Sequence, residues 1–118
     1  DQSGDGMTRY ARRTDNTHAD IRSTLRGAGW IVTDFSAVGS GVPDLRALKG
    51  TVGVWIDAKS KGGEIEHAQV KFAALHPECL FIAAVTPEWA LQMCHKAWSG
   101  KFLPRGMWHC EDGVKVED

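Results

Sequence analysis

The chain has 118 residues, of which 42% are hydrophobic and 25% are charged, and its formal net charge is −1 at pH 7. This length and composition are typical of a single globular domain. No apolar run approaches the roughly 20 residues of a membrane span, and nothing resembles a signal peptide. The three cysteines lack the paired spacings of a disulfide framework or a zinc knuckle. A membrane-spanning or disulfide-stapled protein is therefore excluded, and we expect a cytoplasmic one.

The two ends of the chain differ from its middle. Residues 1–7 are polar and glycine-rich, so we expect a leader or a disordered start, followed by a single domain over residues 8–118. Residues 1–109 contain 13 Lys and Arg against 11 Asp and Glu, whereas the last nine residues contain one Lys against four acids. The body of the chain is thus mildly basic, which suits phosphate contacts but not strong sequence-independent binding of nucleic acid.

A helix is predicted from Thr17 to about Arg26, because a capping residue begins it and glycines follow its last turn. Ile21 and Leu25 lie one turn apart and mark the apolar face. His18 lies one turn before Ile21, so we expect it on or beside the face that packs against the sheet.

Three strands are predicted next. The β-branched and aromatic residues at 30–35 are typical of a strand. After a glycine-containing loop at 36–42, residues 43–48 and 52–59 are expected to form a hairpin, because a short turn with Gly50 separates them. The glycines of the loop allow a close approach to a ligand, although an ordinary mobile loop has the same composition.

The second half alternates helix and strand. A helix is predicted at about 66–75, then a central strand at 79–85 whose continuous apolar run indicates cover on both faces. A capping threonine and a proline then begin a helix over about 87–98. The extension from about 99 is too apolar to be simply disordered, and we expect it to pack across the sheet edge or onto a second subunit. The expected apolar side of the 66–75 helix consists of Ala68, Phe72 and Leu75.

Charged residues interrupt the apolar hairpin at Asp44, Asp57 and Lys59. Side chains alternate along a strand, so Asp57 and Lys59 point to the same face. Charges within an apolar strand are costly unless they are paired or bind a metal ion. We therefore expect a functional site here, the alternative being a surface salt bridge at a strand end.

These residues resemble the PD-(D/E)xK nuclease superfamily, with Pro43-Asp44 as the "PD" and Asp57-Ala58-Lys59 as the "(D/E)xK". The sequence is most similar to small VRR-NUC and Holliday-junction-resolvase-like nucleases of phages and bacteria, over about residues 16–89. The resemblance implies an α/β fold with a restriction-endonuclease-like core. Such a core has a central mixed sheet of about four strands flanked by helices, in the order α-β-β-β-α-β-α.

The resemblance also implies a Mg²⁺- or Mn²⁺-dependent DNA endonuclease of phage or mobile-element origin. Its catalytic residues are predicted to be Asp44, Asp57, Lys59 and Gln69. The predicted metal ligands are Asp44, Asp57, the carbonyl of Ala58 and His18. His18 stands where the family commonly has a glutamate, so it is either a ligand or a helix-start histidine bonded to a neighbour.

DNA, branched or duplex, is the expected partner, and a homodimer would place two sites on two strands. The residues predicted to contact DNA are Arg12, Arg13, Arg22, Ser40 and Lys61. For the arm at Arg12 and Arg13, a solvated terminus is the alternative. The competing hypothesis for the whole chain is a catalytically silent module that keeps the fold as a DNA-binding or protein adaptor. Metal-dependent cleavage separates the two hypotheses.

Overall fold

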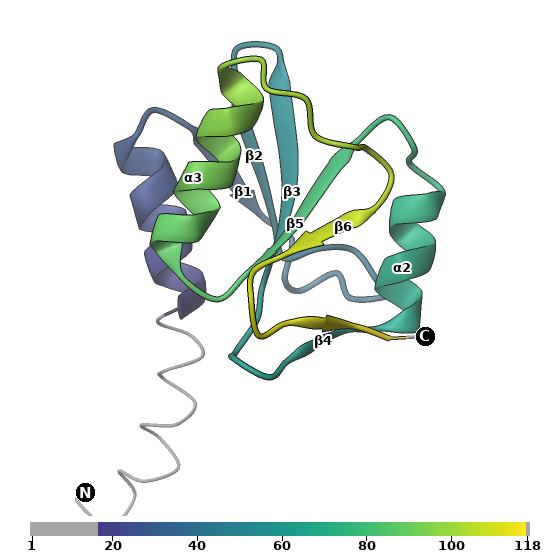
Figure 1. Cartoon of the computed structure of the whole chain (residues 1–118). Coiled ribbons are helices and arrows are strands. Elements are labelled where there is room, and N and C mark those ends of the chain that lie inside the picture. The colour runs from purple at the N-terminus through teal and green to yellow at the C-terminus, as the bar shows by residue number, and fades with distance from the viewer. Residues whose placement is uncertain (1–16, 118) are drawn as a thin grey trace, which may run out of the picture.

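The structure is a computed structural model that describes residues 17–117, so the leader and the basic arm with Arg12 and Arg13 lie outside the described residues. The described chain is an α/β fold with three helices and two sheets. The main sheet has five strands in the order β1-β2-β3-β5-β6, and a small second sheet pairs β4 with β7 (Figure 1). The prediction of an α/β fold with a mixed central sheet is confirmed, with five strands in place of about four.

The first half of the described chain builds the antiparallel part of the main sheet. Its elements are a first helix at 17–27, β1 (Ile31–Asp34), β2 (Leu45–Lys49) and β3 (Val52–Ala58). The expected hairpin is formed by β2 and β3, which are joined through Gly50 at φ 59°. Its register sets Leu45 opposite Ile56, so the residue before β2 faces the end of β3.

The second half adds the parallel part. Its elements are β4 (Glu64–Ile65), α2 (His67–Ala74), β5 (Leu80–Ala84), α3 (Pro87–Trp98), β6 (Trp108–Cys110) and β7 (Lys115–Val116). β5 pairs parallel to β3 and β6 pairs parallel to β5, so α2 and α3 lie in the crossover connections. Thr86 caps α3 by accepting a hydrogen bond from the Trp89 N–H, as predicted.

Two apolar layers cover the two faces of the sheet. On one face, Ile21 and Leu25 of the first helix pack with α3 against the alternate strand residues that include Ile56 and Ile82. On the other face, α2 covers residues that include Phe81. All five residues of β5 are buried, which confirms the predicted central strand with cover on both faces.

The apolar side predicted for α2 is wrong in part. Ala68 is exposed and Leu75 is 73% exposed, whereas Gln69 and Ala73 are buried. The cause is tertiary: the indole Nε1 of Trp108 donates to the backbone oxygen of Gln69 at 2.9 Å, which fixes the inward side of this eight-residue helix.

The C-terminal extension packs on the sheet edge as β6, which confirms the first of its two expected positions. Glu111 then anchors it. Its carboxylate accepts hydrogen bonds from the N–H groups of Val85 and Thr86 at 2.8 and 2.9 Å and from the Thr86 hydroxyl at 2.8 Å. A contact with a second subunit stays a prediction.

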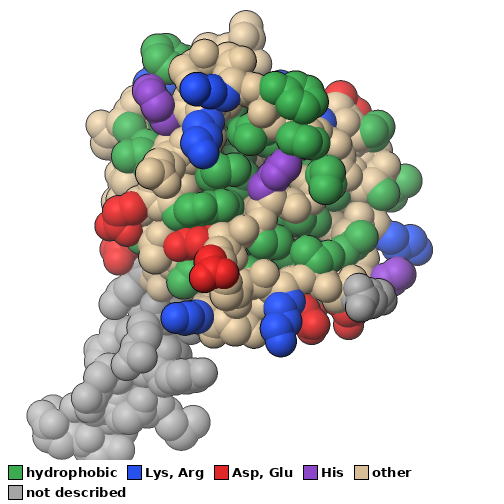
Figure 2. All heavy atoms as spheres, in the orientation of Figure 1, with side chains coloured by type: hydrophobic (Ala, Val, Ile, Leu, Met, Phe, Trp, Pro, Cys, Tyr) green, Lys and Arg blue, Asp and Glu red, His purple; other side chains and the backbone are tan. Residues whose placement is uncertain are grey.

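Several large hydrophobic side chains remain on the exterior. Figure 2 shows hydrophobic atoms spread over the face that carries α3 and β6. Trp98 and two residues of the segment between α3 and β6, Phe102 and Met107, are exposed. Within residues 17–117, none of the helices has both the length and the apolar character needed to cross a bilayer.

Candidate active site

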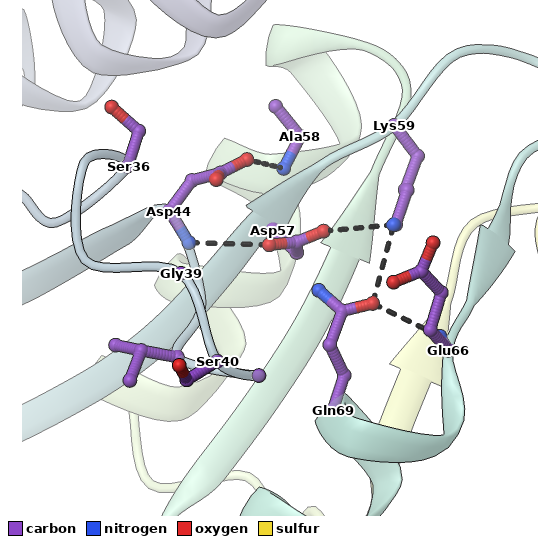
Figure 3. A pocket seen from close by; sticks show the side chains of 11 residues that line it. Ser36, Gly39, Ser40, Asp44, Asp57, Ala58, Lys59, Glu66 and Gln69 are labelled. Carbon is purple, nitrogen blue, oxygen red and sulfur yellow. Dashed lines mark hydrogen bonds and ion pairs between the residues drawn. The ribbon is translucent and has the colours of Figure 1, made fainter.

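A pocket of about 260 Å³ opens where the ends of β2 and β3 meet the loop at 36–42 and the start of α2 (Figure 3). Its lining residues are Ser36, Gly39, Ser40, Gly41, Val42, Asp44, Asp57, Ala58, Lys59, Glu66 and Gln69. All four residues predicted to be catalytic are among them. The structure therefore brings together side chains that come from two strands and a helix.

The loop at 36–42 is held close to α2 by its backbone conformation. Gly41 has φ 85°, and a Cβ at this position would lie 2.4 Å from the backbone oxygen of Ala68. Ser40 also has a positive φ, 57°, which is uncommon for a residue other than glycine. Such backbone conformations persist where the surrounding structure enforces them, and they are frequent at ligand sites. The glycine loop thus packs against α2 and closes one side of the pocket, whereas its close approach to a ligand stays a prediction.

Asp44 directly precedes β2 and Asp57 lies near the end of β3, and each carboxylate accepts a hydrogen bond from the backbone of the other segment. The N–H of Asp44 donates to Asp57 Oδ1 at 3.1 Å, and the N–H of Ala58 donates to Asp44 Oδ2 at 3.3 Å. Asp57 is only 3% exposed. The antiparallel register of β2 and β3 thus fixes the position of both carboxylates (Figure 3).

The two carboxylates repel each other. Burial, and then the negative charge of Asp57, raise the pKa of Asp44 from 3.8 to about 6. The N–H of Ala58 and the positive charges of His18 and Lys59 oppose this rise only in part. A bound cation would remove both causes, because it replaces lost hydration and neutralises the repulsion.

Lys59 is held between an acid and an amide. Its Nζ lies 3.2 Å from Asp57 Oδ2 and donates to Gln69 Oε1 at 3.2 Å. The predicted common direction of Asp57 and Lys59 is confirmed by this ion pair. Gln69 is 8% exposed, so its side chain is buried at the site and does not face solvent.

Glu66 is a lining residue that the sequence prediction missed as part of the site. It begins α2, and its side chain accepts from the backbone of Gln69 while Gln69 Oε1 accepts from the Glu66 N–H at 3.0 Å. This reciprocal pair is a capping box. The spacing of Glu66 and Gln69 was the available signal, because a capping box fixes both side chains at the helix N-terminus.

His18 lies beside the site without lining the pocket. Its Nε2 is buried, has no hydrogen-bond partner among the described residues, and is 3.7 Å from Asp34 Oδ2. Its charge lowers the pKa of both Asp34 and Asp44, so it is near both. Within residues 17–117, no three His, Cys, Asp or Glu side chains are grouped to hold a metal ion. His18 as a ligand therefore stays a prediction.

The predicted DNA contacts lie on different elements of the fold. Ser40 lines the pocket, whereas Lys61 is exposed on the turn after β3. Arg22 is in an ion pair with Asp34, with 3.1 Å between Nη1 and Oδ2, so its charge is already engaged. Arg12 and Arg13 lie outside the described residues.

The pocket thus combines two aspartates, a lysine and a buried glutamine. All three cysteines are free thiols, in agreement with their lack of paired spacings in the sequence. No protein-family model, curated protein or solved structure matches this chain.

Proposed function

We propose that the chain is a metal-dependent DNA endonuclease with a restriction-endonuclease-like core, which hydrolyses phosphodiester bonds in branched DNA such as Holliday junctions or flaps. The observation that carries the proposal is that two carboxylates, Asp44 and Asp57, line one open pocket with a single lysine, Lys59, which is ion-paired with Asp57. A structural ion pair needs one acid for each base. Here burial, and then the charge of Asp57, raise the pKa of Asp44, which is unfavourable for folding and is typical of a functional site.

The donor atoms fit Mg²⁺ or Mn²⁺. Both ions prefer oxygen ligands, and Mg²⁺ commonly binds through one or two carboxylates while it keeps several waters. Asp44 and Asp57 would hold the ion, with the carbonyl of Ala58 as a further oxygen. When bound, it would neutralise charge on the phosphate and favour ionisation of an attacking water.

Lys59 and Gln69 have distinct roles in this proposal. Lys59 is a cation in an ion pair with Asp57, so we assign it to bind a phosphate oxygen and orient the attacking water instead of accepting a proton. Gln69 fixes the lysine amine through its Oε1. Its own amide is fixed by the start of α2, which gives the lysine a rigid support.

A catalytically silent adaptor is the second candidate. The observation that favours it is the lack of a three-residue metal cluster among the described residues, with His18 outside the pocket. The retained acid pair opposes it, since a silent module gains nothing from repelling carboxylates.

The test is cleavage of four labelled DNAs: a four-way junction, a flap, a linear duplex and a single strand. Each is incubated with Mg²⁺, Mn²⁺ or EDTA. We expect metal-dependent cuts that are strongest in the branched DNAs, and paired symmetric nicks at the junction if the protein acts as a homodimer. Binding without any metal-dependent cutting would instead establish the adaptor.

A further inference from the structure

The sheet face that carries the pocket is only partly covered. The strand residues packed beneath α2 come from β3, β4, β5 and β6, and β1 and β2 contribute none among the described residues. Ile31 and Leu48, which alternate with buried residues of β1 and β2, are 69% and 39% exposed on this side. Figure 1 shows α2 beside β5 and β6, with β1 and β2 at the opposite side of the sheet. An open surface therefore extends from the pocket along β2.

The guanidinium of Arg46 lies over the Trp55 ring on this surface. Its Cζ is 4.8 Å from the ring centroid of Trp55, and Trp55 is fixed between Phe35 and Phe72, each at a ring distance of 5.5 Å. A Cβ on Gly53 would come within 2.8 Å of Arg46 Nη2. The lack of a side chain at Gly53 therefore leaves the space that the guanidinium fills, and the Trp55 ring attracts the guanidinium by a cation–π interaction.

This guanidinium has no anionic partner within residues 17–117. Arg22, Arg26 and Arg105 each donate to an oxygen, at 3.1, 2.7 and 3.0 Å. By contrast, Arg46 makes no ion pair or hydrogen bond through its side chain among the described residues. A planar fork of N–H donors, held rigid and unpaired at a half-open surface, is suited to a phosphate.

Arg46 and the pocket share one face in a fixed relation. Arg46 is two residues after Asp44, and its cross-strand partner Trp55 is two residues before Asp57. Two residues of a β-strand span about 7 Å. This length is comparable with the distance between neighbouring phosphates in an extended DNA strand. We propose that Arg46, held by Trp55 and Gly53, binds the nucleic-acid phosphate next to the one in the pocket. This inference rests on the proposed function, in that it takes the pocket to receive a phosphodiester.

The test is a salt titration of DNA binding by the full chain. A labelled DNA flap is used, with Ca²⁺ as the divalent ion and a gel to check that the DNA stays intact, and Kd is measured by fluorescence anisotropy. Arg46→Ala should weaken binding about tenfold and reduce the slope of log Kd against log salt by about one phosphate contact. Arg105→Ala removes the same charge at an exposed site near Glu78 and should change neither.

A second variant separates position from charge. Gly53→Ala keeps every charge but puts a methyl where the guanidinium lies, so we expect a loss of affinity about half as large on the free-energy scale. Gly53 has no positive φ, so the backbone accepts alanine, and thermal melts verify that both variants are folded.

The outcomes distinguish this inference from the proposed function. The phosphate site would be overturned if Arg46→Ala had the same Kd and the same salt slope as the native protein. It would also be overturned if the native protein did not bind DNA. Cleavage by the native protein together with an unchanged Arg46→Ala Kd would overturn the phosphate site alone. Binding that depends on Arg46 in a protein that never cuts would support the phosphate site and overturn the endonuclease.

Discussion

Asp44→Asn replaces one carboxylate of the pocket by an amide of nearly the same shape. The amide oxygen can still accept the hydrogen bond that the Ala58 N–H donates at 3.3 Å. What disappears is a negative charge that is partly buried beside Asp57. We expect this variant to lose DNA cleavage and yet to be more stable than the native protein in the absence of metal, because the native charge pair opposes folding.

The size of the gain follows from the pKa of Asp44. That pKa rises from 3.8 to about 6, chiefly through burial and then through the charge of Asp57. A rise of about 2 units corresponds to about 3 kcal/mol. Water screens the carboxylate in part, so we expect about 1–2 kcal/mol in the free energy of unfolding.

The sign of the pH dependence is fixed by the direction of the shift. A raised pKa means that the native state binds the proton of Asp44 more tightly than the unfolded chain. The stability that the native protein gains from this tighter proton binding is fully present below about pH 4. It is lost as the pH rises through about 6. The free energy of unfolding of Asp44→Asn should therefore equal that of the native protein near pH 4 and exceed it at pH 7.

The assay is urea unfolding in EDTA at both pH values, with Asp112→Asn as the exposed control. Added Mg²⁺ should stabilise the native protein more than the Asp44 variant, because ligands that bind only the native state add to its stability. Equal or lower stability of Asp44→Asn at pH 7 in EDTA would refute the reasoning.

Three further variants probe the supports of the pocket. Gln69→Leu removes the acceptor of Lys59, so DNA cleavage should fall at least about tenfold while the free energy of unfolding, measured in urea, falls by about 1–3 kcal/mol. Gly41→Ala brings a methyl 2.4 Å from Ala68 O at φ 85°, and thermal melts should show a loss of about 2 kcal/mol or more together with lower cleavage. Glu111→Ala removes three hydrogen bonds at the start of α3, so urea unfolding should show a loss of about 2–4 kcal/mol.

Each of these variants has a matched control on the same chain. Gln92→Leu changes an exposed glutamine of α3, and an equal effect on cleavage would contradict the role of the pocket glutamine. Gly39 has a similar backbone conformation, φ 69°, but an added Cβ there would meet no atom within 4 Å. If Gly39→Ala destabilised the protein as much as Gly41→Ala, the clash with α2 would be contradicted. Asp112→Ala removes an exposed acid next to Glu111, and equal losses from both acids would contradict the anchoring role.

The arrangement of the site could be predicted where local rules determine it. The two-residue period of a strand alone places Asp57 and Lys59 together, and their 3.2 Å ion pair confirms it. The inward position of Ile21 and Leu25 in the first helix is confirmed as well, because their spacing of four residues places them on one face of a helix.

Features that depend on distant contacts could not be predicted. The inward side of α2 is set by Trp108, which arrives from β6, a strand of only three residues with no readable alternation. Likewise, nothing in the strand pattern shows that Arg46 lies across Gly53 and Trp55, because the register of the hairpin creates that contact. Such contacts appear only after the strands are paired.

The central claim is that Asp44 and Asp57 hold a divalent cation that serves phosphodiester cleavage. The most direct measurement is the single-turnover rate on the best-cut DNA, for the native protein and Asp57→Asn, with Mg²⁺ or Mn²⁺ and with EDTA. The proposed function predicts cutting by the native protein only with metal, and a rate at least about a hundredfold lower for Asp57→Asn. Equal cutting by the two proteins, or no metal-dependent cutting by the native protein, would contradict it.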